Sequence, residues 1–178
     1  ANNATSYQDA DLIPVTVGET TQLDQTLLPY ATVTGTITDG GQPVAGVQVE
    51  LQDVATYQSY SAYTDNAGHY QVSVWPGTYI ASVRRGDLVQ YVPGKRSRNE
   101  AQQFVVTDGT TVIDEQLLAT GSITGKLTQA DGSPVFFAQV WAFSDTAMLS
   151  AYTDFQGNYT LLAYPDDYRI EFRTSYGN

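Results

Sequence analysis

Hydrophobic and polar residues alternate in short runs along most of the chain. The clearest runs place apolar side chains at every second position: Val33-x-Gly35-x-Ile37, Val47-x-Val49-x-Leu51, Tyr70-x-Val72-x-Val74 and Tyr79-x-Ala81-x-Val83. Each run is bounded by Gly, Pro or Asp-Gly, and a period of two predicts half-buried β-strands. We find no segment with convincing helical periodicity. Short strands about 8–12 residues apart, separated by turns, predict an all-β sandwich fold.

The pattern also repeats along the chain. The repeated segments lie about 90 positions apart, with residues 31–38 recurring as 121–128, residues 61–70 as 150–159, and residues 75–79 as 164–168. Repeats of this kind predict two homologous modules that follow one another with almost no linker. We therefore assign residues 31–118 to a first β-sandwich module and residues 119–178 to a second.

The residues before the first module match the end of that module. Residues 15–28 align with residues 105–118, again about 90 positions apart. Because residues 105–118 directly precede the second module, they form the last strand region of the first. Residues 1–30 thus have the character of final strands, whereas the second module has no copy of its own before Asn178. If Asn178 were followed by another Ala1, the spacing of the first module would be restored within one residue, so we expect one period of a repeating cycle.

Five apolar side chains in this segment have no module of their own in which to be buried: Ile13, Val15, Val17, Leu23 and Leu27. Burying each is worth roughly 1.5–3 kcal/mol, so together they could contribute on the order of 10 kcal/mol. We predict that residues 1 to about 28 complete the second module of a neighbouring copy. The segment is either donated between separate chains or continues covalently from one copy to the next. Both versions give an open-ended, head-to-tail filament. The alternative is that the chain is cut at a position unrelated to its modules.

The repeated residues resemble a known family of modules. The pattern consists of Gly35-Thr-Ile-Thr, Pro43-Val-Ala-Gly-Val47, Tyr63-Thr-Asp-x-x-Gly-x-Tyr70 and Pro76-Gly-Thr-Tyr79, and it recurs in the second module. It is similar to the carboxypeptidase regulatory-like, or collagen-adhesin B-type, domains of microbial surface proteins. The resemblance implies two tandem prealbumin-like (Ig-like) seven-stranded β-sandwiches. It says little about function, because such modules serve as stalks, spacers and adhesive elements. Some members form a Lys–Asn or Lys–Asp isopeptide crosslink; we expect none here, because Lys126 falls on the face opposite Ile123 and Leu127.

Composition narrows the chemistry. With 19 acidic and 8 basic side chains, the net charge is -11, which argues against nucleic acid and anionic membranes as partners. No apolar run approaches 18 residues, so we expect no membrane insertion. The single histidine, His69, and the absence of cysteine leave no triad and no zinc site. We predict no catalytic residues, no metal site and no cofactor, and hence no enzyme.

Each remaining candidate has a structural alternative. Asp65 and Asp154 with Gly68 and Gly157 predict turns; Ca²⁺ binding is the other interpretation, but no loop gathers six to eight oxygens. Trp141 and Phe143 are predicted to point outward as a contact surface or sugar platform, or else to pack under a loop. Five basic residues lie within 15 positions of one another: Arg84, Arg85, Lys95, Arg96 and Arg98. They could pair with acidic residues of the next subunit, such as Asp9, Asp11, Asp166 and Asp167, or they could be ordinary solvated charges. Asn3 and Asn158 match the glycosylation pattern.

These observations predict a structural role at the cell surface or outside the cell. The chain is expected to be a repeat unit of an extracellular filament whose partner is itself. The alternative is an adhesive or carbohydrate-binding module pair that uses Trp141, Phe143 and the stretch with Tyr57, Tyr60 and Tyr63 to bind surface glycans or proteins of a host or neighbouring cell. A third class is a stability domain attached to a secreted hydrolase.

Overall fold

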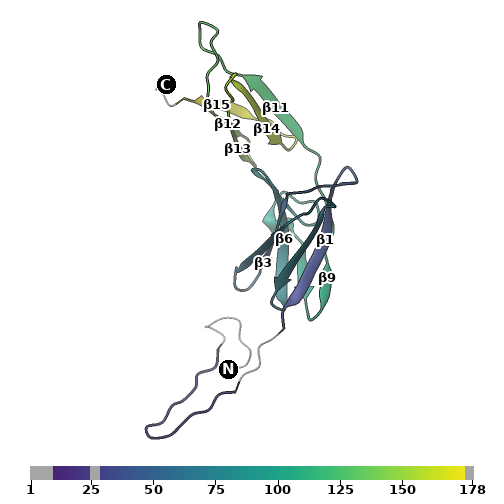
Figure 1. Cartoon of the computed structure of the whole chain (residues 1–178), viewed down its shortest axis with the longest axis vertical. Helices are drawn as coiled ribbons and strands as arrows, with labels where there is room; N and C mark the ends of the chain where they lie inside the picture. The colour runs from purple at the N-terminus through teal and green to yellow at the C-terminus, as the bar shows by residue number, and fades with distance from the viewer. Residues whose placement is uncertain (1–9, 25–28, 175–178) are drawn as a thin grey trace.

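The computed structural model describes residues 10–24 and 29–174, and its regular secondary structure is almost entirely β-strand. The prediction of an all-β sandwich fold is confirmed. The strands form two modules that follow one another end to end (Figure 1). None of the described residues forms a helix with the length and hydropathy that crossing a membrane requires.

The first module contains ten strands and a short 3-10 helix. They are β1 (Ala31–Asp39), β2 (Gln42–Pro43), β3 (Gln48–Asp53), β4 (Ser59–Tyr63), β5 (His69–Val74), β6 (Gly77–Arg85), β7 (Leu88–Tyr91), η2 (Arg98–Glu100), β8 (Gln103–Val106), β9 (Thr110–Val112) and β10 (Glu115–Gln116). One sheet places β1 between β5 and the β9–β10 region, and the other has the order β4-β3-β6, with β7 and β8 both paired to β6.

Alternation of side chains explains how these strands bury a core. In β1, Ala31, Val33 and Ile37 are buried, whereas the threonines between them are half-exposed. Strand β5 shows the same period of two, and its Tyr70, Val72 and Val74 are buried. Both strands present their apolar face to the second sheet, as expected of a sandwich that is solvated on its outer faces.

The second module is built from the five described strands β11 (Gly121–Lys126), β12 (Gln139–Phe143), β13 (Met148–Tyr152), β14 (Asn158–Ala163) and β15 (Arg169–Arg173). Strands β11 and β14 form one sheet, and β13-β12-β15 form the other. Its core cluster contains Val140, Ala142, Leu149 and Leu161, together with Leu88 from strand β7 of the first module. The two modules therefore share buried surface where they meet.

Candidate functional site

The second module has two sheet edges that are covered in the first. In the first module, β6 pairs with β3 on one side and with β7 and β8 on the other, and β1 likewise has β9 and β10 opposite β5. In the second, the equivalent strand β15 pairs with β12, and β11 pairs with β14. Among the described residues, no strand covers the other side of β11 or of β15. Each edge therefore offers unpaired backbone donors and acceptors to another strand.

The core beneath these edges is open as well. Ala81 and Val83 of β6 are 0% and 1% exposed, whereas their counterparts Ile170 and Phe172 of β15 are 36% and 41% exposed. The rings of Phe172 and Tyr159 meet edge to face, with centroids 5.6 Å apart. Apolar side chains of the two sheets are thus less covered than in the first module, and the exposed region between the β11 and β15 edges is called the groove below.

Residues 103–117 supply those contents in the first module. Strand β8 lies antiparallel beside β6, while β9 and β10 lie parallel to β1. Val106, Ile113 and Leu117 are buried in the core. The Tyr70 hydroxyl donates a hydrogen bond of 2.8 Å to the Ile113 carbonyl oxygen. This one segment therefore closes both sheets of the sandwich.

A buried carboxyl group anchors the end of the segment. Glu115 accepts hydrogen bonds from the Gln90 side chain and from the Gly94 amide. Burial raises the pKa of Glu115, and the hydrogen bonds from Gly94 and Gln90 oppose that rise. Gln90 also accepts a hydrogen bond of 2.7 Å from the Leu118 amide, so this network fixes the chain where it leaves the first module.

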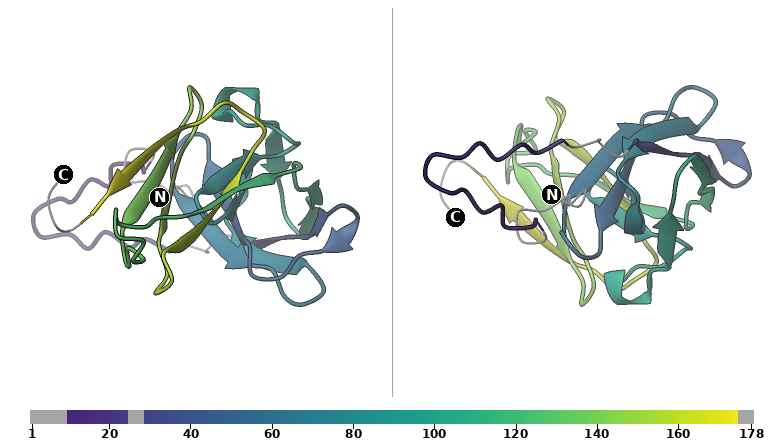
Figure 2. Two further views of the ribbon diagram at one scale, coloured as in Figure 1. Left: turned by 90° about the horizontal axis from the view of Figure 1, so that it is seen from above. Right: turned by 90° about the horizontal axis from the view of Figure 1, so that it is seen from below.

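The N-terminal segment that resembles residues 103–117 has no such surroundings. Residues 10–24 are exposed and extend beyond the end of the first module opposite the second (Figure 1). A view along the molecule also shows them to one side of the sheets (Figure 2). A turn at Val17 and Gly18 is closed by a hydrogen bond of 3.2 Å from the Glu19 amide to the Thr16 carbonyl.

Four of the five predicted inter-subunit positions are exposed large hydrophobics in this segment: Ile13, Val15, Val17 and Leu23. The fifth, Leu27, lies outside the described residues. Their role between subunits stays a prediction.

The Asp-Gly turns have the same geometry in both modules. Asp65 Oδ1 accepts hydrogen bonds from the Ala67 and His69 amides, and Asp154 Oδ1 accepts from the Gln156 and Asn158 amides. Bonds from the His69 and Asn158 amides are the main reason why the pKa values of Asp65 and Asp154 lie below the usual range. Gly68 and Gly157 both adopt positive φ, 73° and 81°. Across the described residues, no three His, Cys, Asp or Glu side chains gather as metal ligands.

Comparison with known protein families identifies the first module. Residues 32–116 match the family model of the carboxypeptidase regulatory-like domain. Over residues 32–116, the first module is therefore similar to the carboxypeptidase regulatory-like domain. The resemblance predicted from its motifs is confirmed. This domain is a non-catalytic, Ig-like fold. No curated protein matches the chain by sequence.

Several solved structures are similar to parts of the chain. A cohesin–X-dockerin complex from Acetivibrio cellulolyticus is 22% identical over 49% of this chain and 56% of that chain, with a TM-score of 0.34. A streptococcal ancillary pilin is 14% identical over 84% of this chain and 56% of its own, with a TM-score of 0.34. The Bacillus anthracis TIE protein is 14% identical over 82% of this chain and 29% of its own, with a TM-score of 0.35. The match thus spans little more than half of the cohesin–X-dockerin chain.

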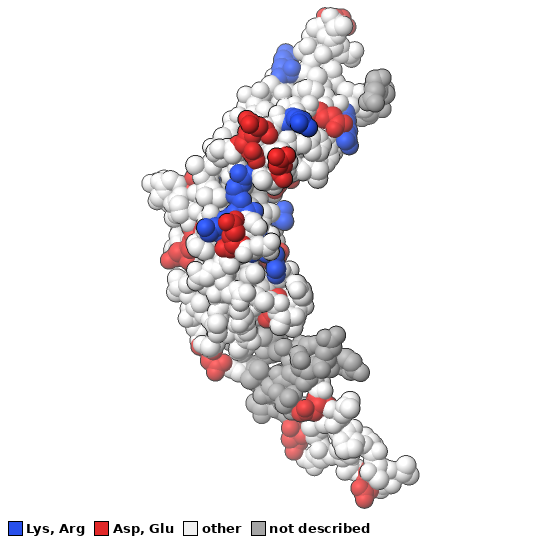
Figure 3. Space-filling model, turned by 180° about the vertical axis from the view of Figure 1, so that it is seen from behind, with Lys and Arg blue, Asp and Glu red and all other residues white. Residues whose placement is uncertain are grey.

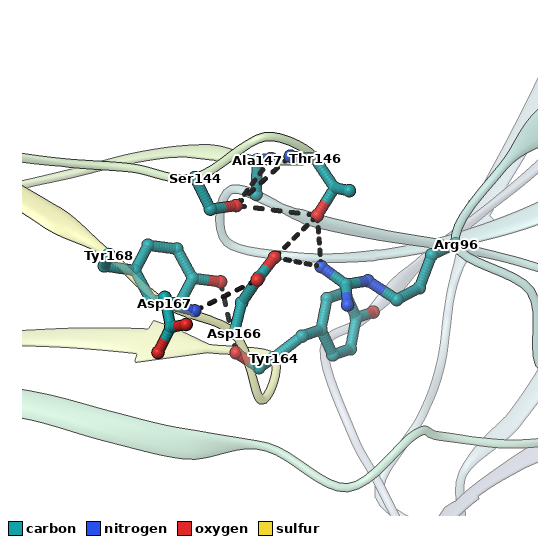
Figure 4. A network of polar contacts seen from close by, with 8 residues as sticks. All are labelled: Arg96, Ser144, Thr146, Ala147, Tyr164, Asp166, Asp167 and Tyr168. Atoms are coloured by element: carbon teal, nitrogen blue, oxygen red, sulfur yellow. Dashed lines mark hydrogen bonds and ion pairs between the residues drawn. The ribbon is translucent and has the colours of Figure 1, made fainter.

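Basic side chains gather near the junction of the two modules (Figure 3), and the basic cluster of the sequence comprises Arg84, Arg85, Lys95, Arg96 and Arg98. Of these, Arg96 forms an ion pair across the junction. Arg96 forms an ion pair of 3.2 Å with Asp166 and donates a hydrogen bond to Thr146 (Figure 4). Asp87 accepts hydrogen bonds from the Ser150 amide and hydroxyl. Pairing of Arg96 with Asp166 of another subunit is therefore not what the structure shows, because the two residues meet within one chain.

Asp166 is the best-connected acid at this junction. Its carboxylate accepts a hydrogen bond of 2.9 Å from Thr146. Hydrogen bonds from Thr146 and Ser144, together with the Arg96 guanidinium, lower the pKa of Asp166 to about 2. Elsewhere in the basic cluster, Arg85 pairs with Asp39 at 2.8 Å and Arg98 donates to Gln52.

Trp141 and Phe143 lie on the outer face of β12, but they are half-buried rather than fully exposed. Their rings stack with centroids 5.9 Å apart, and the Arg173 guanidinium lies 5.6 Å from the Trp141 ring centroid. The indole Nε1 is buried without a hydrogen-bond partner among the described residues. Of the tyrosines considered for adhesion, Tyr57 and Tyr63 are exposed, whereas Tyr60 packs against Tyr79.

An exposed aromatic surface on the second module was not predicted. It consists of Phe136, Phe137, Tyr152 and Phe155 and is called the aromatic patch below. Phe136 stacks on Phe155 with centroids 4.3 Å apart, and Phe137 stacks on Tyr152 at 4.6 Å. The alignment of the two repeats could have revealed this surface, because the first module has Ala45, Gly46 and Asn66 at the positions of the three phenylalanines of the patch.

Proposed function

We propose that the chain is the repeat unit of an extracellular, head-to-tail fibre. In this proposal, a segment equivalent to residues 10–28 of one copy completes the second module of its neighbour. The observation that carries the proposal is the contrast between the modules. Residues 103–117 fill the first module, and the matching groove of the second is open among the described residues.

Burial and backbone pairing both favour filling that groove. The groove exposes Ile170 and Phe172, and the N-terminal segment exposes its own apolar side chains, of which Leu23 matches buried Ile113. Burying an apolar side chain of this size stabilises by roughly 1.5–3 kcal/mol. Unpaired strand edges gain backbone hydrogen bonds at the same time.

The positions of donor and acceptor favour a fibre over a closed ring. Residues 10–24 extend from one end of the molecule, and the β11 and β15 edges lie in the module at the other end (Figure 1). A contact between two different surfaces at opposite ends is heterologous, and it propagates into a filament unless the rotation closes a ring. The net charge of -11 per copy would keep such a fibre soluble.

A circular permutant tests the proposal. Moving residues 1–30 from the front of the chain to follow Asn178 places the completing segment within reach of its own second module. We expect the permutant to be a monomer that unfolds at a higher temperature than the natural order of residues does when dilute. A permutant that is no more stable than the dilute natural chain would contradict the proposal.

Denaturing electrophoresis of native fibres separates the two versions of the proposal. Donated strands between separate chains give a discrete band of single-copy size, to which these residues contribute 19.4 kDa. A covalently continuous array gives a very large species. Both outcomes are compatible with a groove filled by the same segment.

Adhesion is a second candidate function, and the aromatic patch is the observation that favours it. Phe137 adopts φ of 56°, a conformation that is strained for a bulky side chain, whereas the first module has Gly46 with φ of 72° at the same position. Strain at an exposed phenylalanine points to a role outside the fold. Exposed aromatic faces suit the apolar faces of sugar rings, and the acidic chain argues against an anionic lipid surface.

Binding to a panel of purified polysaccharides tests this second candidate. Phe155→Asn restores the residue type found at Asn66 and removes the most exposed ring of the aromatic patch. We expect it to abolish retention on any polysaccharide that the chain binds, while the matched change Tyr63→Ser in the first module leaves retention intact. If no polysaccharide is bound, or if Phe155→Asn binds as well as the unchanged chain, adhesion through this patch is wrong.

A further inference from the structure

The close approach of the Tyr159 side chain to Gly125, called the slot below, would determine how the completing segment docks. We infer that the Leu23 carbonyl of a second copy packs against the backbone of Gly125. There it would accept a hydrogen bond from the Tyr159 hydroxyl. This inference rests on the proposed function and adds a docking site and a register to it.

The filled version of the slot is visible in the first module. A Cβ atom placed on Gly35 would lie 1.9 Å from the Ile113 carbonyl oxygen, so only glycine permits the strand to approach. Tyr70, which pairs with Gly35 across the sheet, donates its hydroxyl to that same oxygen. The Ile113 amide in turn donates a hydrogen bond of 2.8 Å to the Thr34 carbonyl oxygen. Gly35 thus leaves room for the Ile113 carbonyl, and Tyr70 holds that carbonyl with a hydrogen bond.

The second module has the same glycine and tyrosine. Gly125 pairs with Tyr159 in the register in which Gly35 pairs with Tyr70. A Cβ atom on Gly125 would meet the Tyr159 hydroxyl at 2.4 Å, and its three nearest atoms all belong to the Tyr159 side chain rather than to any backbone. Within the described residues, the Tyr159 hydroxyl has no hydrogen-bond partner, and its ring lies over the glycine. The Tyr159 side chain therefore occupies the space over Gly125 that the Ile113 carbonyl oxygen occupies over Gly35, and a docking carbonyl would displace it.

The sequence after the turn identifies that carbonyl. Thr20-Thr21-x-Leu23-x-x-x-Leu27 matches Thr110-Thr111-x-Ile113-x-x-x-Leu117, in which both aliphatic residues are buried. Leu23 therefore takes the place of Ile113, and Gln22 lies beside Thr124 as Val112 lies beside Thr34.

The sequence before the turn fixes the second register. Two residues lie between Val17 and Thr20, whereas three lie between Val106 and Thr110, so docking in this register would also move Val17 out of the turn that it forms in the undocked segment. This shorter turn places Val17 at the position of Val106, which is 1% exposed, and Val15 at the position of Phe104. A turn of equal length would place Val15 at the position of Val105, which is 70% exposed. Because a slip of one residue exchanges the two faces of a strand, burial of the valines selects the shorter turn.

Disulfide crosslinking tests both registers, since the natural chain has no cysteine. Gln22→Cys with Thr124→Cys should give a ladder of crosslinked copies under mild oxidation, because directly paired strand residues lie within disulfide reach. Thr34→Cys with Val112→Cys is the positive control, since these residues pair within the first module. Thr21→Cys with Thr124→Cys is the negative control, because its cysteines point to opposite faces.

The turn register is tested by two further pairs at Asp167, whose counterpart Thr78 pairs with Val105. The shorter turn predicts a ladder for Thr16→Cys with Asp167→Cys and none for Val15→Cys with Asp167→Cys. The reverse result overturns this register while leaving the proposed fibre intact. Fibres that form without a Gln22–Thr124 crosslink overturn the slot alone, and a chain that neither crosslinks nor assembles overturns the proposed function as well.

Gly125→Ala supplies an independent readout of the slot. We expect loss of the disulfide ladder and of sedimenting fibres, because the new methyl group would occupy the space of the Leu23 carbonyl. The dilute chain should keep its folded signal, since the three nearest atoms all belong to the Tyr159 side chain, which can move. Normal fibre assembly by Gly125→Ala would overturn the inference.

Discussion

The two modules share their local hydrogen bonds and differ in their cores. The Ile37 amide donates a hydrogen bond of 2.9 Å to the Gly68 carbonyl, and the Leu127 amide donates one of the same length to the Gly157 carbonyl. The hydroxyls of Tyr79 and Tyr168 each donate to the carbonyl four residues earlier. The first module nevertheless buries Val83, whereas the second exposes its counterpart Phe172. Local sequence thus specifies turns and strand pairs, while a complete sandwich also requires a final segment that lies elsewhere in the chain.

The largest difference between the modules should appear when the completing segment loses an aliphatic side chain. Ile113→Ala should destabilise the first module by about 4 kcal/mol, because the residue is buried in the core. Leu23→Ala should change the stability of a dilute, unassembled chain by no more than about 0.5 kcal/mol. In the fibre, the same change should weaken association roughly 100-fold. Urea unfolding and sedimentation measure the two effects, and equal destabilisation of the dilute chain by both variants would contradict the account.

Alanine at the paired glycines should give the next largest difference. Gly35→Ala should cost about 3 kcal/mol in the first module, since the methyl group would collide with a backbone carbonyl. Gly125→Ala should cost about 1 kcal/mol or less in the dilute chain, because a side chain can move aside. Thermal unfolding of the two variants at low concentration measures the contrast. Similar losses in both would show that the Gly125 slot is already filled.

Removing the strained phenylalanine should make the second module more like the first. Phe137→Gly replaces a residue with φ of 56° by the glycine found at position 46, and we expect a gain of about 0.5–1 kcal/mol. Calorimetry measures this gain. A loss of more than about 1 kcal/mol would mean that Phe137 is kept for packing rather than for binding.

The smallest of these effects should be the weakening of the junction between the modules in acid. The pKa of Asp166 is lowered to about 2, so its contribution is present above its usual pKa of 3.8 and is lost as the pH falls from there towards 2. Asp166→Asn should therefore flatten the fall in unfolding temperature over this interval. A variant whose pH profile matches that of the unchanged chain would rule out this contribution.

Much of the fold could be predicted from the sequence because its signals are local. Alternation in residues 33–37 and 70–74 predicts strands, and the structure confirms the all-β sandwich. The repeated Asp-x-x-Gly segments predict turns, and the hydrogen bonds of Asp65 and Asp154 show how those turns are made. The role of Leu23 between copies remains a prediction that depends on the alignment with Ile113.

Features that depend on contacts distant in sequence could not be predicted. The ion pair of Arg96 with Asp166 arises because the two modules pack against one another, which charge counting does not show. Trp141 is half-buried because it stacks on Phe143 and lies near Arg173, two strand positions that the alternation alone treats as outward-facing. The strain at Phe137 is a property of the backbone, so only comparison with Gly46 hints at it.

Calorimetry of the unchanged chain over a range of concentrations tests the central claim most directly. If a neighbour completes the second module, mass action should raise its unfolding transition, by about 2.7 kcal/mol of stability for a 100-fold rise in free partner. The transition of the first module, which contains its own final strands, should stay at one temperature. Two transitions that both stay fixed across the range would contradict the account, because the second module would then be complete without a neighbour.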